Sequence, residues 1–135
     1  MGAWSTDIYG NDTAADWAWE LDDSSDFELI NSTLDAVLDD DDYLDASVAE
    51  EGLAAAEALT FVLGRPARNN SYTESVDKWA KRVQAAPPPE LVSKAQAAIT
   101  RILADDSEIR ELWEESDAGE EWTAELHGLQ QRLAG

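Results

Sequence analysis

The sequence predicts an all-α fold, in which residues 1–135 form one domain: a compact bundle of about six to seven short amphipathic helices. Apolar residues recur at intervals of three and four residues in successive segments, as on one face of a helix. Residues that cap or stop helices separate these segments. No segment alternates polar and apolar residues, and no Asn-Gly or Asp-Gly hairpin turn is present, which argues against a sheet.

The opening segment, residues 1–21, is unusually aromatic for a chain terminus. Its large side chains lie on both sides of Gly10-Asn11-Asp12 in the sequence and are Trp4, Ile8, Tyr9, Trp17, Trp19 and Leu21. Aromatic residues at this density bury a large area, so we expect an aromatic-rich N-terminal loop docked on the core. The residues Asn11-Asp12-Thr13 supply caps for a first helix, whose apolar face carries Ala14, Trp17, Ala18 and Leu21.

Trp19 lies off that apolar face, and two interpretations follow. In the first, Trp4 and Tyr9 hold the helix to the core and Trp19 covers a second contact. In the second, Trp19 lines a shallow binding site together with three carboxylates, Asp7, Asp12 and Asp16.

The two following helices are predicted from capping boxes. Ser25 and Glu28 open a helix that extends to about Asp39, with Phe27, Ile30, Leu34, Val37 and Leu38 on one face. Ser47 and Glu50 open the next, over residues 48–63, which Gly64 ends. Its alanines permit close approach of neighbouring helices, so this helix is expected at the centre of the bundle.

The second half of the chain predicts four more segments. Thr73 or Ser75 caps a shorter helix that contains Trp79, and a rigid connector, Pro87-Pro88-Pro89, leads into the clear apolar stripe of residues 91–103. Asp105 and Glu108 cap the next helix, with an inward face of Ile109, Leu112 and Trp113. The last helix follows Gly119 and carries Trp122, Leu126, Leu129 and Leu133.

Several of these segments carry a family resemblance. The opening residues 1–4 and the pattern Tyr9-x-Asn11-Asp12-x-Ala14-x-Asp16-Trp17 are followed by Tyr43-Leu44, residues 54–57, residues 63–66, residues 108–115 and the apolar positions from Trp122 to Leu133. Together they make the chain similar to the bacterial domain of unknown function 4259 family. Ser5 and Asp7 depart from it, since the family pattern usually has glycines there. The resemblance implies one compact domain and nothing about a substrate.

The formal charge of −21 is distributed unevenly. Residues 1–64 contain seventeen Asp and Glu and no Lys or Arg, whereas residues 65–104 contain seven basic residues against three acidic ones. A strongly negative field repels nucleic acids and anionic membranes and favours a basic protein partner. Adaptation to a salty cytoplasm or a need for solubility would explain the same composition.

The densest run of acids is Asp39, Asp40, Asp41 and Asp42, at the expected end of the second helix. Negative charge there opposes the helix dipole, so solvent, a cation or arginines must offset it. Residues 39–50 fit a calcium loop only in part, because Tyr43 occupies position five and Leu44 the position of the required glycine. We therefore interpret the run as a solvated acidic turn and expect no metal or cofactor.

Motifs for catalysis are missing. The chain has no cysteine, no phosphate-binding glycine loop, no nucleophile elbow and no zinc-binding helix motif, and its single histidine, His127, is expected on the polar side of the last helix. We therefore expect no enzyme. No signal peptide or membrane span is apparent, which predicts a cytoplasmic location.

The leading functional hypothesis is a small acidic protein that engages a basic protein, as immunity proteins and inhibitors of basic toxins do. Its candidate interaction residues are Asp7, Asp12, Asp16 and Trp19 together with the run Asp39–Asp42. The alternative is an inhibitor that mimics nucleic acid, and a metal-dependent hydrolase is a more distant one. Oligomeric state and partner identity do not follow from the sequence.

Overall fold

The computed structural model describes residues 7–39, 42–67, 73–83 and 85–134. Seven helices form within these residues, and none of the described residues belongs to a strand longer than an isolated bridge. The helices are α1 (Asp12–Asp22), α2 (Glu28–Leu38), α3 (Ala46–Val62), α4 (Glu74–Val83), α5 (Pro89–Ile102), α6 (Glu108–Glu114) and α7 (Gly119–Ala134). The predicted all-α bundle is confirmed.

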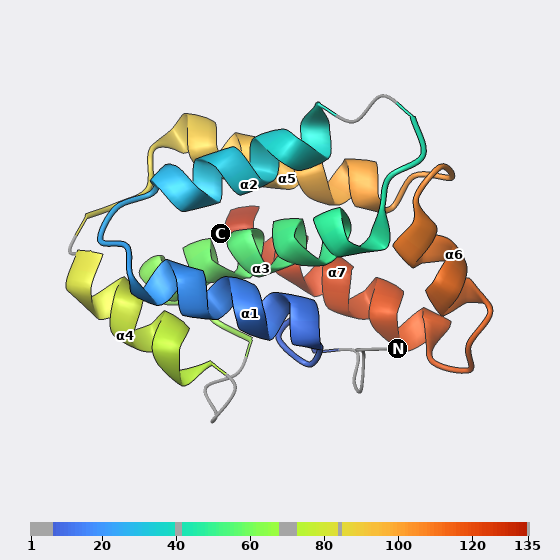
Figure 1. Ribbon diagram of the computed structural model, residues 1–135, viewed down its shortest axis with the longest axis horizontal. Coiled ribbons are helices and arrows are strands. Elements are labelled where there is room, and N and C mark those ends of the chain that lie inside the picture. The colour runs from blue at the N-terminus through green and yellow to red at the C-terminus, as the bar shows by residue number, and fades with distance from the viewer. Residues whose placement is uncertain (1–6, 40–41, 68–72, 84, 135) are drawn as a thin grey trace.

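Helix α3 occupies the centre and contacts each of the other six helices. Figure 1 shows α2 and α5 packed together on one side of α3, α1 and α4 on the other, and α6 at one end. Nearly all of α3 from Ala49 to Phe61 is buried, as expected for a helix that is apolar on every side. The predicted central position is therefore confirmed.

Small residues let the helices approach α3 closely. A Cβ atom added at Gly52 would lie 2.5 Å from Val37 Cγ2 of α2, which is closer than carbon atoms pack. Gly52 and the neighbouring alanines therefore set the spacing between α3 and α2. At its other end α3 stops as predicted, because Gly64 takes a left-handed conformation with φ of 77°.

The connection between α2 and α3 is joined to the start of α6. Leu44 is fully buried, its N–H donates to Asp106 O at 2.9 Å and its carbonyl accepts from Glu108 N–H at 2.9 Å. Glu108 Oε1 also accepts from Ala46 N–H at 2.8 Å. Nearby, the Tyr43 hydroxyl donates to Glu111 Oε1, and this hydrogen bond raises the pKa of Tyr43 to about 12.

Several predicted helix starts are wrong by a few residues. Helix α2 begins at Glu28, whose N–H donates to Asp26 Oδ1 at 3.1 Å, so Ser25 is not its cap. Asp45 caps α3 in place of Ser47, and its Oδ1 accepts from Ser47 N–H at 2.8 Å. Helix α6 follows Ser107, and Asp105 instead pairs with Arg110.

Two predicted packing positions also differ. Leu112 of α6 was expected to face inward, but it is 38% exposed because α6 contacts the bundle mainly through Ile109 and Trp113. In the opening segment Ile8 and Tyr9 are buried, and the Tyr9 hydroxyl donates to Ala54 O of α3 at 2.6 Å. Trp4 lies outside the described residues, so the docked aromatic loop as a whole stays a prediction.

Candidate functional site

One side of α1 carries a line of acidic side chains beside an exposed tryptophan. Asp12, Asp16 and Glu20 succeed one another at intervals of four residues, and all three are exposed. Trp19 lies beside this row on the same side of α1 and is 73% exposed. We call these four residues the α1 stripe. The interpretation in which Trp19 covers a second core contact is therefore wrong.

The rest of α1 explains why the stripe faces outward. Asn11 Oδ1 caps the helix by accepting from Ala14 N–H at 2.8 Å. On the opposite face Ala14, Trp17, Ala18 and Leu21 are buried. Trp17 Nε1 donates to Thr33 Oγ1 of α2 at 2.9 Å, and that hydroxyl donates to Leu29 O at 2.7 Å. This buried chain of hydrogen bonds fixes the rotation of α1 about its axis.

Carboxylates of α3 add to the negative field around the stripe. Burial raises the pKa of Glu50, and the charges of Asp45, Asp12 and Glu108 raise it further, against a lowering hydrogen bond with Thr13. Burial likewise raises the pKa of Glu51, with a further contribution from the charge of Glu20. The repulsion is therefore felt between α1 and α3, and a positive charge placed outside would relieve it.

Six basic residues of the described chain form ion pairs with other acids. Arg82 Nη1 lies 3.6 Å from Asp22 Oδ1, and Lys94 Nζ lies 2.7 Å from Asp35 Oδ1. Among the described residues no ion pair includes an acid of the α1 stripe. Their charge is accordingly left to solvent.

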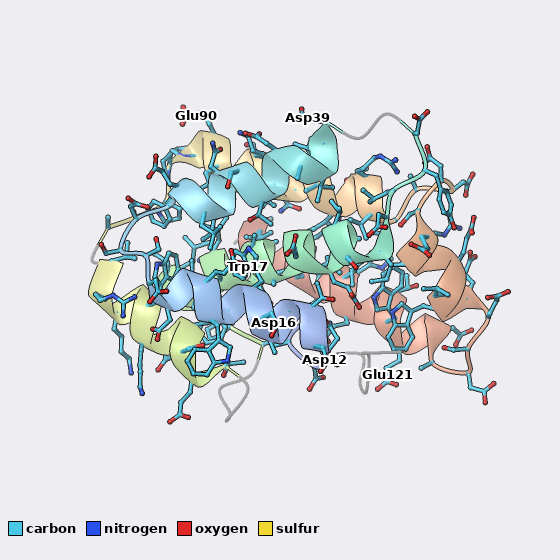
Figure 2. The ribbon with its side chains drawn as sticks, in the orientation of Figure 1. Asp12, Asp16, Trp17, Asp39, Glu90 and Glu121 are labelled. Atoms are coloured by element: carbon cyan, nitrogen blue, oxygen red, sulfur yellow. The ribbon has the colours of Figure 1, made fainter. Side chains whose placement is uncertain are left out.

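The other candidate residues lie elsewhere. Figure 2 shows Asp39 at the end of α2, far across the view from Asp12 and Asp16 on α1. Asp39 and Asp42 are exposed, whereas Asp40 and Asp41 fall outside the described residues. Arg101 Nη2 donates to Asp42 O at 2.5 Å. An arginine therefore lies near this turn, which is one of the three ways in which the sequence analysis expected the negative charge to be offset.

Asp7 precedes α1 and is not part of the α1 stripe. It lines a small cavity of about 10 Å³ with Glu50 of α3 and Trp122 of α7, among others. A space of that size holds about one water molecule. The six candidate residues that the structure describes therefore do not make one site: Asp12, Asp16 and Trp19 come together, and Glu20 joins them although the sequence pattern was not used to select it. The four-residue spacing from Asp12 and Asp16 was the signal that could have found it.

A buried ion pair was also missed. Glu57 lies in the middle of α3, only 3% exposed, and its Oε1 accepts from Arg132 Nη2 of α7 at 2.5 Å. Thr60 Oγ1 and Ala67 N–H each donate to Glu57 Oε2 at 3.1 Å. Burial raises the pKa of Glu57, while the charge of Arg132 lowers it. The sequence signal that could have indicated this ion pair was a single acidic residue between Ala56 and Ala58, in a helix expected at the centre of the bundle.

Nothing in the described residues forms a recognisable reaction centre. His127 is exposed on α7. In the described part of the chain, no group of three or more His, Asp or Glu side chains is placed so that they could bind one metal ion. Nor does any helix there combine the length and the apolar character that a membrane span needs.

Comparison with known proteins gives a family and no activity. No curated protein matches the chain, and no solved structure matches it. The model of one family matches residues 2–125 and so covers nearly all of the chain. On that match, the chain belongs to the family described as a domain of unknown function (DUF4259).

Proposed function

We propose that this protein is a small acidic binding protein of the cytoplasm that engages a basic protein through the α1 stripe, in the manner of immunity proteins and inhibitors. The observation that carries the proposal is the stripe itself: Asp12, Asp16 and Glu20 form an exposed acidic row beside Trp19, which is 73% exposed, and no described cation pairs with them. A large exposed aromatic residue with a charged rim is a typical composition for the centre of a protein interface.

The chemistry of the stripe defines the partner. Lysine and arginine side chains would meet the three carboxylates, and an apolar or cationic group would cover the indole of Trp19. Opposite fields of this kind raise the association rate and make it sensitive to salt.

Capture from native lysate at low and at high salt tests the proposal. The wild-type protein should retain a basic protein at low salt, and high salt should release it. The variant D12K/E20K and the variant W19S should each lose it. The matched control is E120K/E121K, which reverses two exposed acids on α7 and should keep the partner. Equal capture by D12K/E20K and the control would refute a role for the stripe.

Nucleic-acid mimicry remains the second candidate because the stripe is a regular row of carboxylates. The row spans only nine residues, from Asp12 to Glu20, or about 12 Å of helix, which is short compared with the length of duplex that DNA-binding proteins contact. If the captured partner binds DNA, added duplex should displace it from the wild-type protein. If duplex DNA does not displace the partner, nucleic-acid mimicry is excluded and the basic-protein proposal stands.

A further inference from the structure

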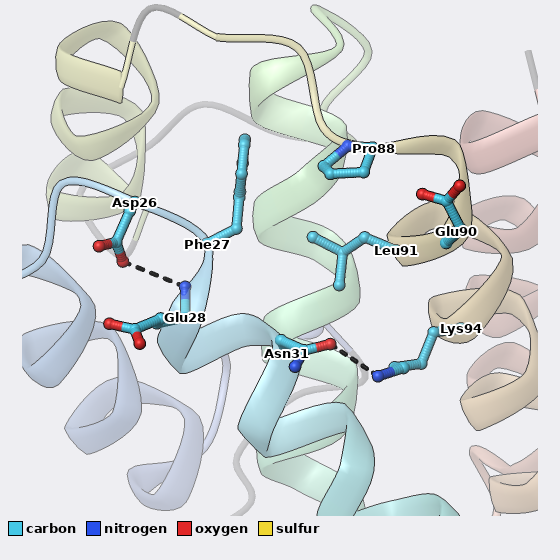
Figure 3. A pocket seen from close by; sticks show the side chains of 8 residues that line it. All are labelled: Asp26, Phe27, Glu28, Asn31, Pro88, Glu90, Leu91 and Lys94. Atoms are coloured by element: carbon cyan, nitrogen blue, oxygen red, sulfur yellow. Dashed lines mark hydrogen bonds between the residues drawn. The ribbon is translucent and has the colours of Figure 1, made fainter.

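A groove lies between the first turns of α2 and α5, on a different part of the molecule from the α1 stripe. Its volume is about 450 Å³, within the range of sites that hold small organic molecules. Figure 3 shows Phe27, Pro88 and Leu91 in the middle of the groove, with Asp26 and Glu28 on one side and Glu90 on the other. The groove thus combines an apolar floor with carboxylates on both sides.

The apolar floor is held in place by the surrounding structure. Leu91 is 5% exposed, and its N–H donates to Pro88 O at 2.9 Å where α5 begins. The ring of Phe27 packs edge-on against Trp79 of α4, with 6.0 Å between ring centroids. The floor therefore exists before any ligand arrives, which lowers the cost of binding.

The charges around the groove favour a cation. Asp26, Glu28 and Glu90 are all exposed, and no ion pair in the described part of the chain includes them. Lys94 is the one basic residue of the lining, and its charge is already neutralised. Its Nζ donates to Asn31 Oδ1 at 2.6 Å and lies 2.7 Å from Asp35 Oδ1.

From this arrangement we infer that the groove binds small organic cations that have an apolar body, of the size of an arylalkylamine. The body would cover Phe27 and Leu91, and the ammonium group would be attracted by the carboxylates on the two sides of the groove. An organic anion of the same shape would meet three carboxylates without a cation to receive it. This inference does not depend on the proposed protein partner, because the α1 stripe contributes nothing to the groove.

Titration with phenethylammonium at neutral pH, followed by the amide shifts of the full-length protein, tests the inference. The amide NMR signals of Phe27, Glu28 and Leu91 should move as phenethylammonium is added, and phenylacetate should leave them where they are. The variant E28Q/E90Q should weaken binding about five- to tenfold, as the loss of two partly exposed charge contacts implies. The matched control E120Q/E121Q removes two exposed acids from the first turn of α7 and should bind as the wild type does.

Three outcomes would overturn the inference. They are shifts confined to α1 and other acidic surfaces, equal binding of phenylacetate, and equal weakening by E28Q/E90Q and by the control. Absence of binding at millimolar phenethylammonium would also overturn it. Asp26 is left unchanged in the variants because its carboxylate accepts from Glu28 N–H at the start of α2.

Discussion

Glu57 is the charged residue whose surroundings are most demanding. A carboxylate in the centre of α3 loses its hydration, and the loss is compensated only by specific partners. Arg132 supplies the charge, and Thr60 and the backbone of Ala67 supply two hydrogen bonds. Arg65 Nε in turn donates to Arg132 O at 2.7 Å. The pair thereby joins the centre of α3 to the C-terminal end of α7.

Removing the cation alone should be costly. Arg132→Met leaves Glu57 buried without its charge partner, and we expect a loss of about 3 kcal/mol or more in the free energy of unfolding. The double variant R132M/E57Q should recover part of this loss, because a neutral amide is easier to bury. Urea denaturation measures both effects.

The control for this prediction is Arg110→Met, which breaks surface ion pairs with Asp105 and Glu114. Asp105 is fully exposed in its side chain, so we expect a change of at most about 1 kcal/mol. Similar losses in R132M and R110M would show that burial does not strengthen the dependence of Glu57 on its partner.

At the scale of the element, the start of α3 is decided by Asp45. Its backbone is extended, and its carboxylate accepts from Ser47 N–H at 2.8 Å and from Val48 N–H at 3.4 Å. These two amides would otherwise lack an intrahelical partner. Ser47, which the sequence pattern favoured, lies one residue inside the helix and is exposed.

Substitutions at these two positions separate the alternatives. Asp45→Ala should lower the free energy of unfolding by about 1 kcal/mol, since alanine cannot accept from the free amides. Asp45→Asn should stay close to the wild type because asparagine caps equally well. Ser47→Ala should change stability little, and thermal or urea denaturation measures all three. A larger loss from Ser47→Ala than from Asp45→Ala would contradict the observed cap.

At the scale of the whole molecule, the charges of the first half remain largely on the surface. Some are neutralised by the basic segment of residues 65–104, as Asp22 is by Arg82 and Asp35 by Lys94. The acids of the α1 stripe are not among these pairs. Folding brings them near the carboxylates of α3, and this repulsion lowers the stability of the folded state.

Salt should relieve the repulsion. We expect the thermal midpoint to rise between low salt and 1 M sodium chloride, where the Debye length falls to about 3 Å. The variant D16N/E20Q should raise the low-salt midpoint and reduce the salt effect. As a control, Asp35→Asn removes the ion pair with Lys94 and should not raise it. A wild-type midpoint that is flat or falls with salt would mean that the basic segment neutralises these acids within the fold.

Mild acid should not destabilise the fold through its buried carboxylates. The folded-state pKa values of Glu50, Glu51 and Glu57 are raised above the ordinary 4.5, chiefly by burial. A raised carboxyl pKa contributes stability that is full below the unfolded pKa and is lost as pH rises through the folded pKa. Lowering the pH from 7 to 5 should therefore hold or raise the thermal midpoint.

The variant E50Q/E51Q checks the origin of this pH dependence. Glutamine is neutral at every pH, so the variant should respond less than the wild type between pH 7 and 5. Thermal denaturation across this range measures the difference. A wild-type midpoint that falls on acidification, or an unchanged response in E50Q/E51Q, would show that other carboxylates dominate.

The sequence by itself determined the helices, their order and most of their buried faces. Trp17 and Leu21 of α1, and Leu126 and Leu129 of α7, are buried where their spacing predicted. Gly64 and Pro89 also end and begin helices as expected. These features depend on neighbours within one or two turns, so the local pattern is sufficient to specify them.

Only the tertiary structure decided which residues meet across the chain. Glu57 and Arg132 are 75 residues apart, and the groove joins Phe27, directly before α2, with Leu91 of α5. The division of the candidate acids, with Asp12 and Asp16 in the α1 stripe and Asp7 beside Trp122, is likewise a result of packing. The physical reason is that spacing along one helix fixes which side chains share a face, whereas burial and charge pairing depend on the helix that covers that face.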